Sequence, residues 1–182
     1  DRVEDVRRIA GRRPAGAVTC LARAAETDPE PAVRRAAVIE LGRFDDPEAR
    51  QAVEKALDDR SPHVQKAAAG TLGLFGDDAA ADRLGALAGS QAHIEQRMAS
   101  VLGLARCRSD RAIVWLLDTA ENCPNDELKL AAIGELFAKL GMRYVGSGPA
   151  NRVQWLDQVE LVKDFPQVIA AYSRASRPLA RH

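Results

Sequence analysis

The sequence repeats itself about every 31 residues, and this period constrains the fold more than any other feature. Four segments share an apolar first residue and a leucine eight positions later. They begin at Val33, Val64, Ile94 and Leu128, which are 31, 30 and 34 residues apart. A period of about 20 to 50 residues is typical of a solenoid, in which each unit stacks on the next.

Each copy also has the pattern of an amphipathic helix. Its first residue and the residues three, four and eight positions later lie on one stripe, as contact with a core on one side requires. The first three copies share a Leu-Gly step, at Leu41-Gly42, Leu72-Gly73 and Leu102-Gly103. A second amphipathic segment precedes each copy, which predicts the order helix, turn, helix, turn. Together with a short segment that opens the chain, these cover residues 3–10, 14–26, 47–57, 79–88 and 110–121.

Turn chemistry and composition agree with this order. Asp28-Pro29 and Ser61-Pro62 place a capping side chain before a proline that can open a helix. Apolar residues make up 46% of the chain but aromatic residues only 4%, so Ala, Leu and Val supply most of the packing. Alanine has the highest intrinsic helix propensity. The sequence therefore predicts an all-α fold, a right-handed α-α superhelix of about four helix pairs.

The stretch from Asp28 to Ala37, followed by Leu41-Gly42 and Asp46-Pro47, resembles the HEAT-like repeat associated with phycobilisome lyases. The resemblance covers about residues 14–140. It implies stacked helix pairs whose second helices line a concave face, on which partners usually bind.

The same resemblance implies a hydrogen-bonded ladder between neighbouring repeats. In the family, an Asp before the second helix and an Arg six residues later tend to form it. Asp28 and Arg34 match this pattern, whereas Asp59 is followed by Gln65 at the second position. An intact ladder is therefore expected in one repeat only.

We assign residues 1–141 to the solenoid and residues 142–182 to a helical C-terminal cap with a basic tail. The terminal unit of a stack offers an apolar surface that needs a cover. After Gly141 the repeat pattern stops, and half of the chain's eight aromatic residues follow. They are Tyr144, Trp155, Phe165 and Tyr172.

Charge and hydropathy narrow the classes of function. Lys plus Arg and Asp plus Glu number 26 each, so no excess positive charge is available for phosphates, and nucleic acid is disfavoured as a partner. No run approaches the roughly 18 apolar residues of a membrane span, and the N-terminus lacks the pattern of a signal peptide. We therefore expect a cytoplasmic protein that does not enter a membrane.

The sequence shows no catalytic motif. The histidines His63, His93 and His182 have no metal-ligand spacing, and the three cysteines match none either. We expect no cofactor and no bound metal. Cys20 lies in an apolar stretch and is expected in the core, whereas Cys107 and Cys123 fall near helix ends and are expected to reach solvent.

The leading interpretation is a non-catalytic protein-protein interaction module that acts as an adaptor, scaffold or regulatory subunit. Two alternatives rest on likeness to other HEAT-like proteins. One is a nucleic-acid-binding protein similar to the alkylpurine DNA glycosylases, because Trp115 and Asp118 weakly resemble their functional residues. The other is a subunit similar to the bilin lyases, which share the repeat.

Helix periodicity predicts which residues line the concave face. The residues two, six and ten positions after the start of each second helix point away from the core. They give a face that runs from basic at its N-terminal end to apolar at its C-terminal end, suited to a peptide or helix with an acidic end and an apolar end. The predicted residues are Arg35, Ile39, Arg43, Lys66, Gly70, Leu74, Gln96, Ser100, Leu104 and Leu130, with Gly134 and Ala138 after them.

Overall fold

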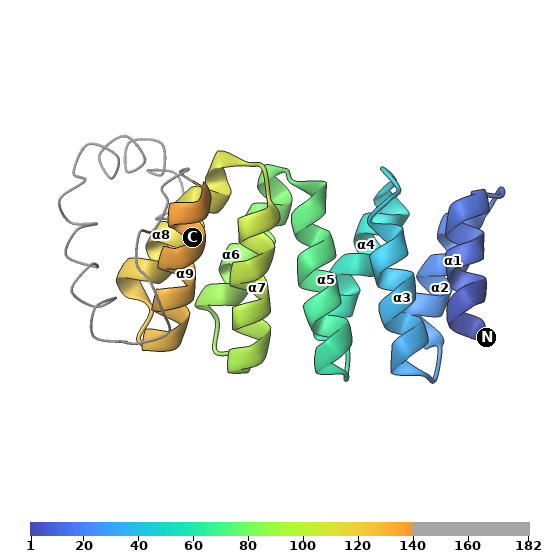
Figure 1. The fold of residues 1–182 in the computed structure, drawn as a ribbon, viewed down its shortest axis with the longest axis horizontal. Coiled ribbons are helices and arrows are strands. Elements are labelled where there is room, and N and C mark those ends of the chain that lie inside the picture. Colours follow the sequence, from blue (N-terminus) through green and yellow to red (C-terminus); the bar gives the residue numbers. More distant parts are fainter. Residues whose placement is uncertain (140–182) are drawn as a thin grey trace, which may run out of the picture.

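The computed structural model describes residues 1–139, which form nine α-helices and one short 3-10 helix. Short turns join successive helices, and neighbouring helices fold back on one another (Figure 1). The helices are α1 (Arg2–Arg12), α2 (Ala17–Thr27), α3 (Pro31–Leu41), α4 (Pro47–Lys55) with the 3-10 turn η1 (Ala56–Asp58), α5 (Pro62–Phe75), α6 (Asp78–Gly89), α7 (Ile94–Arg106), α8 (Asp110–Asn122) and α9 (Asp126–Lys139).

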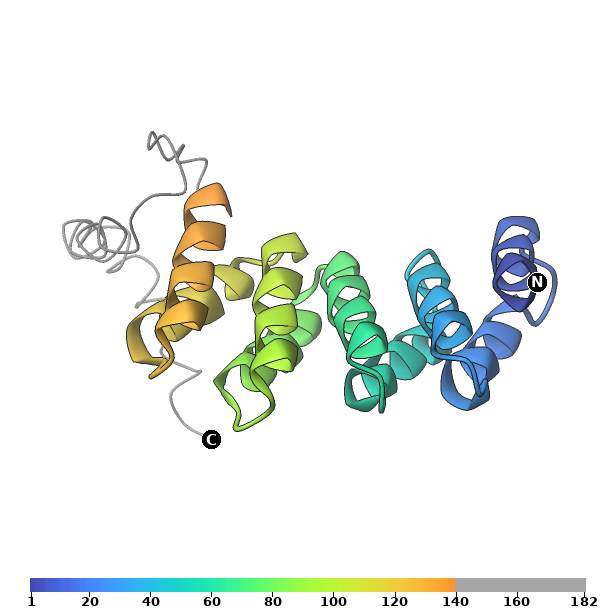
Figure 2. The same cartoon turned by 60° about the horizontal axis from the view of Figure 1, so that its bottom comes forward.

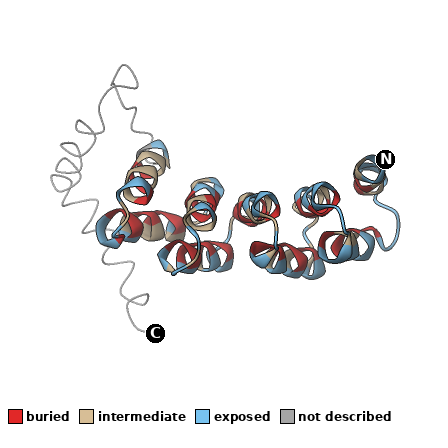
Figure 3. Ribbon diagram, turned by 90° about the horizontal axis from the view of Figure 1, so that it is seen from below, coloured by how far each residue is buried: buried red, intermediate tan, exposed pale blue. Residues whose placement is uncertain are grey.

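The helices form two layers. The inner layer holds α1, α3, α5, α7 and α9, the row nearer the viewer in Figure 1 and the upper row in Figure 3. The outer layer holds α2, α4, α6 and α8 behind it, and Figure 2 shows the two rows advancing together along the long axis. Both ends of the inner row turn away from the outer layer, so the inner row forms the concave side (Figure 3). The prediction of an all-α solenoid with four helix pairs is confirmed, and α1 occupies the place of a second helix at the start of the stack.

The predicted caps of the second helices are only partly confirmed. Pro62 opens α5, but the Ser61 side chain makes no capping hydrogen bond within the described residues, and α3 begins at Pro31 after Glu30 and not at Asp28-Pro29. Aspartate side chains cap helices of the outer layer. The Asp46 carboxylate accepts hydrogen bonds from the amides of Glu48 and Ala49 at the start of α4, at 2.8 and 3.3 Å. Asp77 caps α6 in the same way, accepting from the Ala80 amide at 2.9 Å. Such caps satisfy amide groups that have no partner in the first turn of a helix.

The core is a continuous strip between the layers, shown in red in Figure 3. Fully burying one leucine side chain stabilises a fold by about 1.5–3 kcal/mol, and each helix pair adds such residues to the strip. Among the largest of them are Leu21, Leu41, Leu57, Leu72, Leu84, Leu104, Leu116 and Leu128.

The third repeat has a different register from the predicted one. Each second helix has a buried leucine at the corresponding position. These leucines are Leu41 in α3, Leu72 in α5, Leu104 in α7 and Leu136 in α9. The second helices are therefore 31, 32 and 32 residues apart, and Ile94 does not occupy the position of Val64. Leu102, which the Leu-Gly alignment placed in the core, is 36% exposed.

The misleading Leu-Gly match has a physical cause. A Cβ added to Gly73 would lie 2.2 Å from the carbonyl oxygen of Gly103, so the α5 and α7 backbones approach too closely for any side chain. A Cβ on Gly42 would similarly lie 2.6 Å from Cγ2 of Thr71 on the next second helix. Gly103 therefore corresponds to Thr71 and not to Gly73. Like Thr71, it is the residue against which the glycine of the preceding second helix packs.

The cysteine environments are the reverse of those predicted. Cys20 is exposed on α2, whereas Cys107 and Cys123 are buried. Cys107 and Cys123 are the C-terminal caps of α7 and α8. Burial raises the pKa of the Cys107 thiol. The predicted cap and tail at residues 142–182 lie outside the described residues.

Arg13 joins α1 to the first complete repeat. It adopts the left-handed conformation (φ 47°), which is unfavourable for a residue with a side chain. Its guanidinium lies 4.9 Å from the centre of the Phe44 ring and donates a hydrogen bond of 2.8 Å to the Arg43 carbonyl. These contacts hold the turn after α1 against the end of α3.

We expect Arg13→Ala to lower the free energy of unfolding by about 1–2 kcal/mol, because it removes a cation–π contact and a hydrogen bond while the strained backbone remains. Amide hydrogen exchange should show faster exchange confined to α1. The neighbouring exposed Arg12 provides the control, and Arg12→Ala should change stability by less than about 0.5 kcal/mol. Equal effects of the two substitutions would contradict a specific role for Arg13.

Candidate functional site

The concave side carries a groove of about 690 Å³ that crosses three second helices. We call it the α3–α7 groove. Its walls come mainly from α3 and α5, and one long side chain from α7 completes it. It is lined by Pro31, Ala32, Arg35, Ile39, His63, Lys66, Ala67, Gly70, Thr71, Leu74 and Arg106.

All charged residues that line the α3–α7 groove are cations, namely Arg35, Lys66 and Arg106, beside the ionisable His63. Within residues 1–139, none of the three cations takes part in an ion pair. This concentration of unpaired positive charge stands out in a chain of zero net charge.

Most cations of the outer layer behave differently, because they pair with acids of the neighbouring repeat, although Arg23 of α2 forms no such pair within the described residues. Lys55 of α4 lies 2.8 Å from Glu26 of α2, and Arg111 of α8 lies 2.8 Å from Asp82 of α6. Arg50 and Asp77 form a third such link. These three outer-layer cations, and Arg83 as a fourth, therefore serve contacts within the stack, whereas the three cations of the groove are free to meet another molecule.

Large apolar side chains are exposed on the same face. In the described part of the chain, the exposed large hydrophobic residues are Ile39 of α3, Leu74 of α5 and Leu102 of α7, with exposed fractions of 41%, 60% and 36%. All three lie on second helices. Single exposed leucines are common in soluble proteins, but apolar residues gathered on one face indicate an interaction surface.

Gly70 makes room for the cation that completes the groove. A Cβ at this position would lie 2.8 Å from Nη1 of Arg106, so the Arg106 guanidinium rests directly over the α5 backbone. A glycine within a helix is unfavourable by about 1 kcal/mol relative to alanine. The close approach of Arg106 gives Gly70 a role in shaping the groove.

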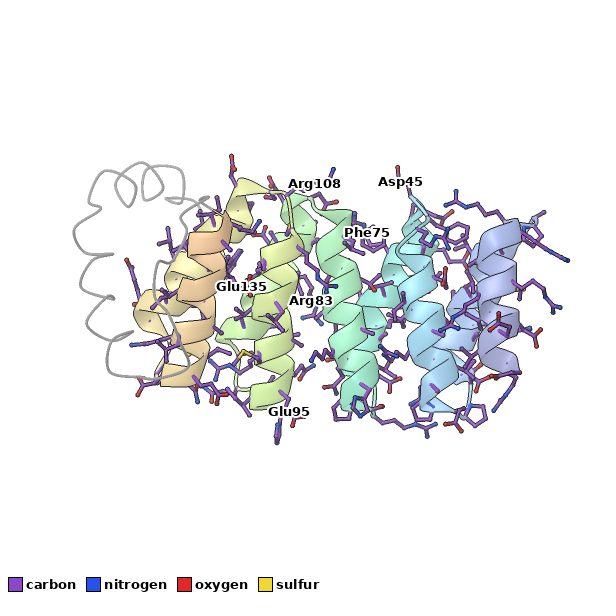
Figure 4. All side chains as sticks on the ribbon, viewed as in Figure 1. Asp45, Phe75, Arg83, Glu95, Arg108 and Glu135 are labelled. Atoms are coloured by element: carbon purple, nitrogen blue, oxygen red, sulfur yellow. The ribbon has the colours of Figure 1, made fainter. Side chains whose placement is uncertain are left out.

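A second depression, of about 370 Å³, continues the concave face toward α9. Met98 and Leu102 line it with apolar side chains, Glu95 and Glu127 contribute acidic groups, and it shares His63 and Lys66 with the α3–α7 groove. Figure 4 shows Glu95 at the start of α7 and Glu135 on α9. The concave face is thus basic across α3 and α5, and apolar with acidic edges across α7 and α9.

The structure brings together five of the predicted concave residues, Arg35, Ile39, Lys66, Gly70 and Leu74, in the α3–α7 groove. Two others lie on the inner layer but do not line it. Arg43 lies beyond the end of α3 and pairs with Glu40 at 2.9 Å, and Leu130 lies on α9.

The prediction is wrong for three residues of α7, because it placed the third repeat two residues too early. Ser100 and Leu104 are fully buried, and the Gln96 side chain donates to the Leu57 carbonyl at 2.6 Å. Met98, Leu102 and Arg106 occupy the outward positions instead. Arg97 carries the signal that could have set the register, since it lies 63 residues after Arg34 and makes equivalent contacts.

Arg34 links the first two repeats, as expected of a ladder between neighbouring repeats. Its Nε donates to Asp59 of the next repeat at 2.8 Å, and its Nη1 donates to the backbone carbonyl of Asp28 at 2.9 Å. The Asp28 carboxylate instead pairs with Arg2 of α1, at 3.0 Å. Asp28 and Asp59 therefore each accept a hydrogen bond from an arginine of the preceding inner helix.

The ladder extends further than predicted. Arg97 of α7 donates to the Ala88 carbonyl of its own repeat at 2.8 Å and to the Cys123 sulfur of the next at 3.2 Å. Gln65 of α5 donates to a backbone carbonyl of its own repeat, that of Asp59, at 2.6 Å, but makes no equivalent bond to the next repeat within the described residues. The link between neighbouring repeats is thus present on α1, α3 and α7 and incomplete on α5.

Trp115 and Asp118, which suggested a glycosylase-like site, have structural surroundings in the outer layer. A Cβ added to Gly85 would lie 2.0 Å from Cδ2 of Trp115, so the indole ring packs directly against α6. The indole Nε1 donates a hydrogen bond of 2.9 Å to the Asp82 carboxylate. Asp118 is exposed and accepts from Asn122, one turn away, at 2.8 Å. Trp115 therefore joins α8 to α6.

We expect Trp115→Ala to lower the free energy of unfolding by about 2–3 kcal/mol, because the ring fills the contact between α6 and α8. Asp118→Ala should change it by less than about 0.5 kcal/mol. Urea denaturation followed by circular dichroism measures both. A Trp115→Ala variant with normal stability but lost retention on DNA would contradict this assignment.

Comparison with known families agrees with the architecture. The model for HEAT repeats matches residues 18–105 and 58–136, which is more than half of the chain. The chain belongs to the HEAT repeat family. Members of this family commonly act as protein-interaction modules. A likeness to the phycobilisome-lyase type in particular stays a prediction, and no curated protein matches the chain.

None of the helices within residues 1–139 is long and apolar enough to cross a membrane. The same residues hold no group of three or more His, Cys, Asp or Glu side chains that could bind a metal ion.

Proposed function

We propose that this HEAT repeat protein is a non-catalytic adaptor, scaffold or regulatory subunit that holds a segment of another protein in the α3–α7 groove. The observation that carries the proposal is the gathering of unpaired cations and exposed apolar residues in one concave groove. Buried apolar contacts supply most of the binding energy of protein interfaces, and charged rims guide orientation.

A protein segment suits the α3–α7 groove better than a nucleic acid does. Leu74 and Ile39 offer apolar side chains, and none of the groove-lining residues is a Phe, Tyr or Trp on which a base could stack. The concave face also turns acidic toward α9, through Glu95 and Glu127, which would repel a phosphate backbone that followed the whole face.

Site-specific photo-cross-linking tests the proposal. A photoreactive amino acid is placed at Leu74 in the groove or, as the matched control, at the exposed Arg23 of α2 on the outer layer. After irradiation in extract of the source cells, we expect one protein to be cross-linked from Leu74 and not from Arg23. The cross-linked protein is then purified, and its affinity is measured directly.

The purified partner should bind the wild-type chain and lose at least about tenfold in affinity with Leu74→Asp, because a charge would be buried against an apolar contact. Arg23→Asp should leave the affinity unchanged. Cross-linking of the same protein from both positions, or equal affinity of the Leu74→Asp variant, would overturn the proposal.

A further inference from the structure

We infer that the segment bound in the α3–α7 groove is an amphipathic helix that presents aspartate or glutamate side chains on both sides of an apolar strip. This inference rests on the proposed function and specifies the chemistry of the ligand. It follows from the order in which cations and apolar residues occur along the three helices.

The cations flank an apolar centre. Arg35 lies one helical turn before Ile39 on α3, and Lys66 lies one turn before Gly70 on α5. Arg106 lies one turn after Leu102 on α7 and reaches back over Gly70. Ile39, Gly70 and Leu102 therefore form the middle row, with two cations on one side and a third on the other.

Carboxylates match this distribution better than a phosphate group does. The three cations come from three helices and border an apolar strip, whereas a phosphate dianion requires donors that converge on one point. Carboxylates spaced along a helix can each meet one cation. The small side chain of Gly70 leaves room for a ligand residue to contact the α5 backbone between them.

Acidic residues set the direction of the ligand. The depression toward α9 shares Lys66 with the groove on its α5 side, but Glu95 of α7 and Glu127 of α9 line its other side, so a carboxylate placed beside these two glutamates would be repelled. Met98 and Leu102 offer apolar contacts at the same place. The acidic end of the ligand helix therefore lies over α3 and α5, and its apolar end over α7.

Fluorescence anisotropy with labelled synthetic peptides tests the inference. The probe is an amphipathic helical peptide with Glu on both sides of a Leu strip. Its companions replace every Glu by Gln, replace every Glu by Lys, or remove the carboxylates and carry one phosphoserine. A single-stranded oligonucleotide of similar length is the fifth probe. All are titrated at low salt, where exposed charges are screened least.

We expect the Glu peptide to bind at least about tenfold more tightly than the Gln peptide, and its affinity to fall as salt rises. Arg35→Glu, Lys66→Glu and Arg106→Glu should each weaken it about three- to tenfold, whereas Arg23→Glu on the outer layer should have no effect. Equal binding of the Glu and Gln peptides, or tighter binding of the phosphoserine peptide or the oligonucleotide, would overturn the inference.

Gly70→Ala provides a variant that disturbs the groove without weakening the fold. The new methyl group displaces the flexible end of Arg106, not a backbone atom, and the helix gains propensity. We expect a more stable protein that binds the Glu peptide about twofold to fivefold more weakly. Gly134→Ala lies at the equivalent position of α9, where no atom of residues 1–139 is within 4 Å of the new Cβ, and it should raise stability and leave binding unchanged.

The two experiments separate failure of this inference from failure of the proposed function. Cross-linking from Leu74 together with equal affinity for the Glu and Gln peptides would retain the groove as a binding site and reject an acidic ligand. Absence of cross-linking from Leu74 and of peptide binding would reject both.

Discussion

Gly73→Ala should lower the free energy of unfolding by about 2–4 kcal/mol, although alanine has the higher helix propensity. The added Cβ would lie 2.2 Å from the Gly103 carbonyl oxygen, and both atoms belong to or adjoin the backbone. No change of side-chain rotamer can relieve this overlap, so α5 and α7 must move apart. Urea denaturation followed by far-UV circular dichroism measures the effect.

The shape of the transition should change as well. A solenoid is stabilised by the contacts between neighbouring repeats, and α5 and α7 lie in the middle of this one. Weakening that contact should split a single unfolding transition into two. Gly134→Ala is the control, and it should raise stability by about 0.5–1 kcal/mol. A Gly73→Ala variant as stable as the control would show that the two helices do not approach as described.

Asp59→Ala should lower the free energy of unfolding by about 3–5 kcal/mol, because it leaves the Arg34 guanidinium buried without its charged partner. The two side chains are 2% and 10% exposed and are joined by two hydrogen bonds, of 2.8 and 2.9 Å. The exposed pair of Lys55 and Glu26 offers a control, and Lys55→Ala should lower stability by less than about 1 kcal/mol.

The contribution of Asp59 should depend on pH. Burial opposes its ionisation, but hydrogen bonds from Arg34 and from the Ser61 amide outweigh burial and lower the pKa of Asp59. A pKa that is lower in the folded state stabilises the fold above the unfolded value, about 3.9, and this stability is lost as the pH falls through the folded value.

Asp59→Asn should therefore be less stable than the wild-type chain at neutral pH, and the difference should shrink under acid conditions. Replacing both partners together, Arg34→Met with Asp59→Leu, should restore much of the stability, since no charge is then buried alone. An Asp59→Ala variant that unfolds at the wild-type urea concentration would contradict a structural role for this pair.

Most of the fold can be predicted from the sequence because the same local signals recur in each repeat. Prolines and capping residues mark the helix starts, and apolar periodicity marks the buried stripe. The third repeat defeats this reasoning, because Gly103 resembles the glycine of the earlier Leu-Gly steps. Its role is set by the close approach of Gly73, a contact between repeats that periodicity does not reveal.

The candidate site was predictable in part for the same reason. Arg35, Lys66 and Leu74 follow from helix periodicity in the two repeats with the correct register. Arg106 does not, because its place in the groove depends on the register of α7 and on a side chain that reaches across to Gly70. Aligning Arg97 with Arg34 in the sequence, as the two ladder residues, would have given the correct register of α7. It would also have placed Arg106 on the concave face.

Amide hydrogen exchange of the chain with and without the partner captured from Leu74 tests the central claim most directly. If the concave face binds it, the partner should slow exchange in α3, α5 and the end of α7, while the outer helices α2, α4 and α6 stay unchanged. Protection confined to the outer helices would contradict the assignment of function to the α3–α7 groove.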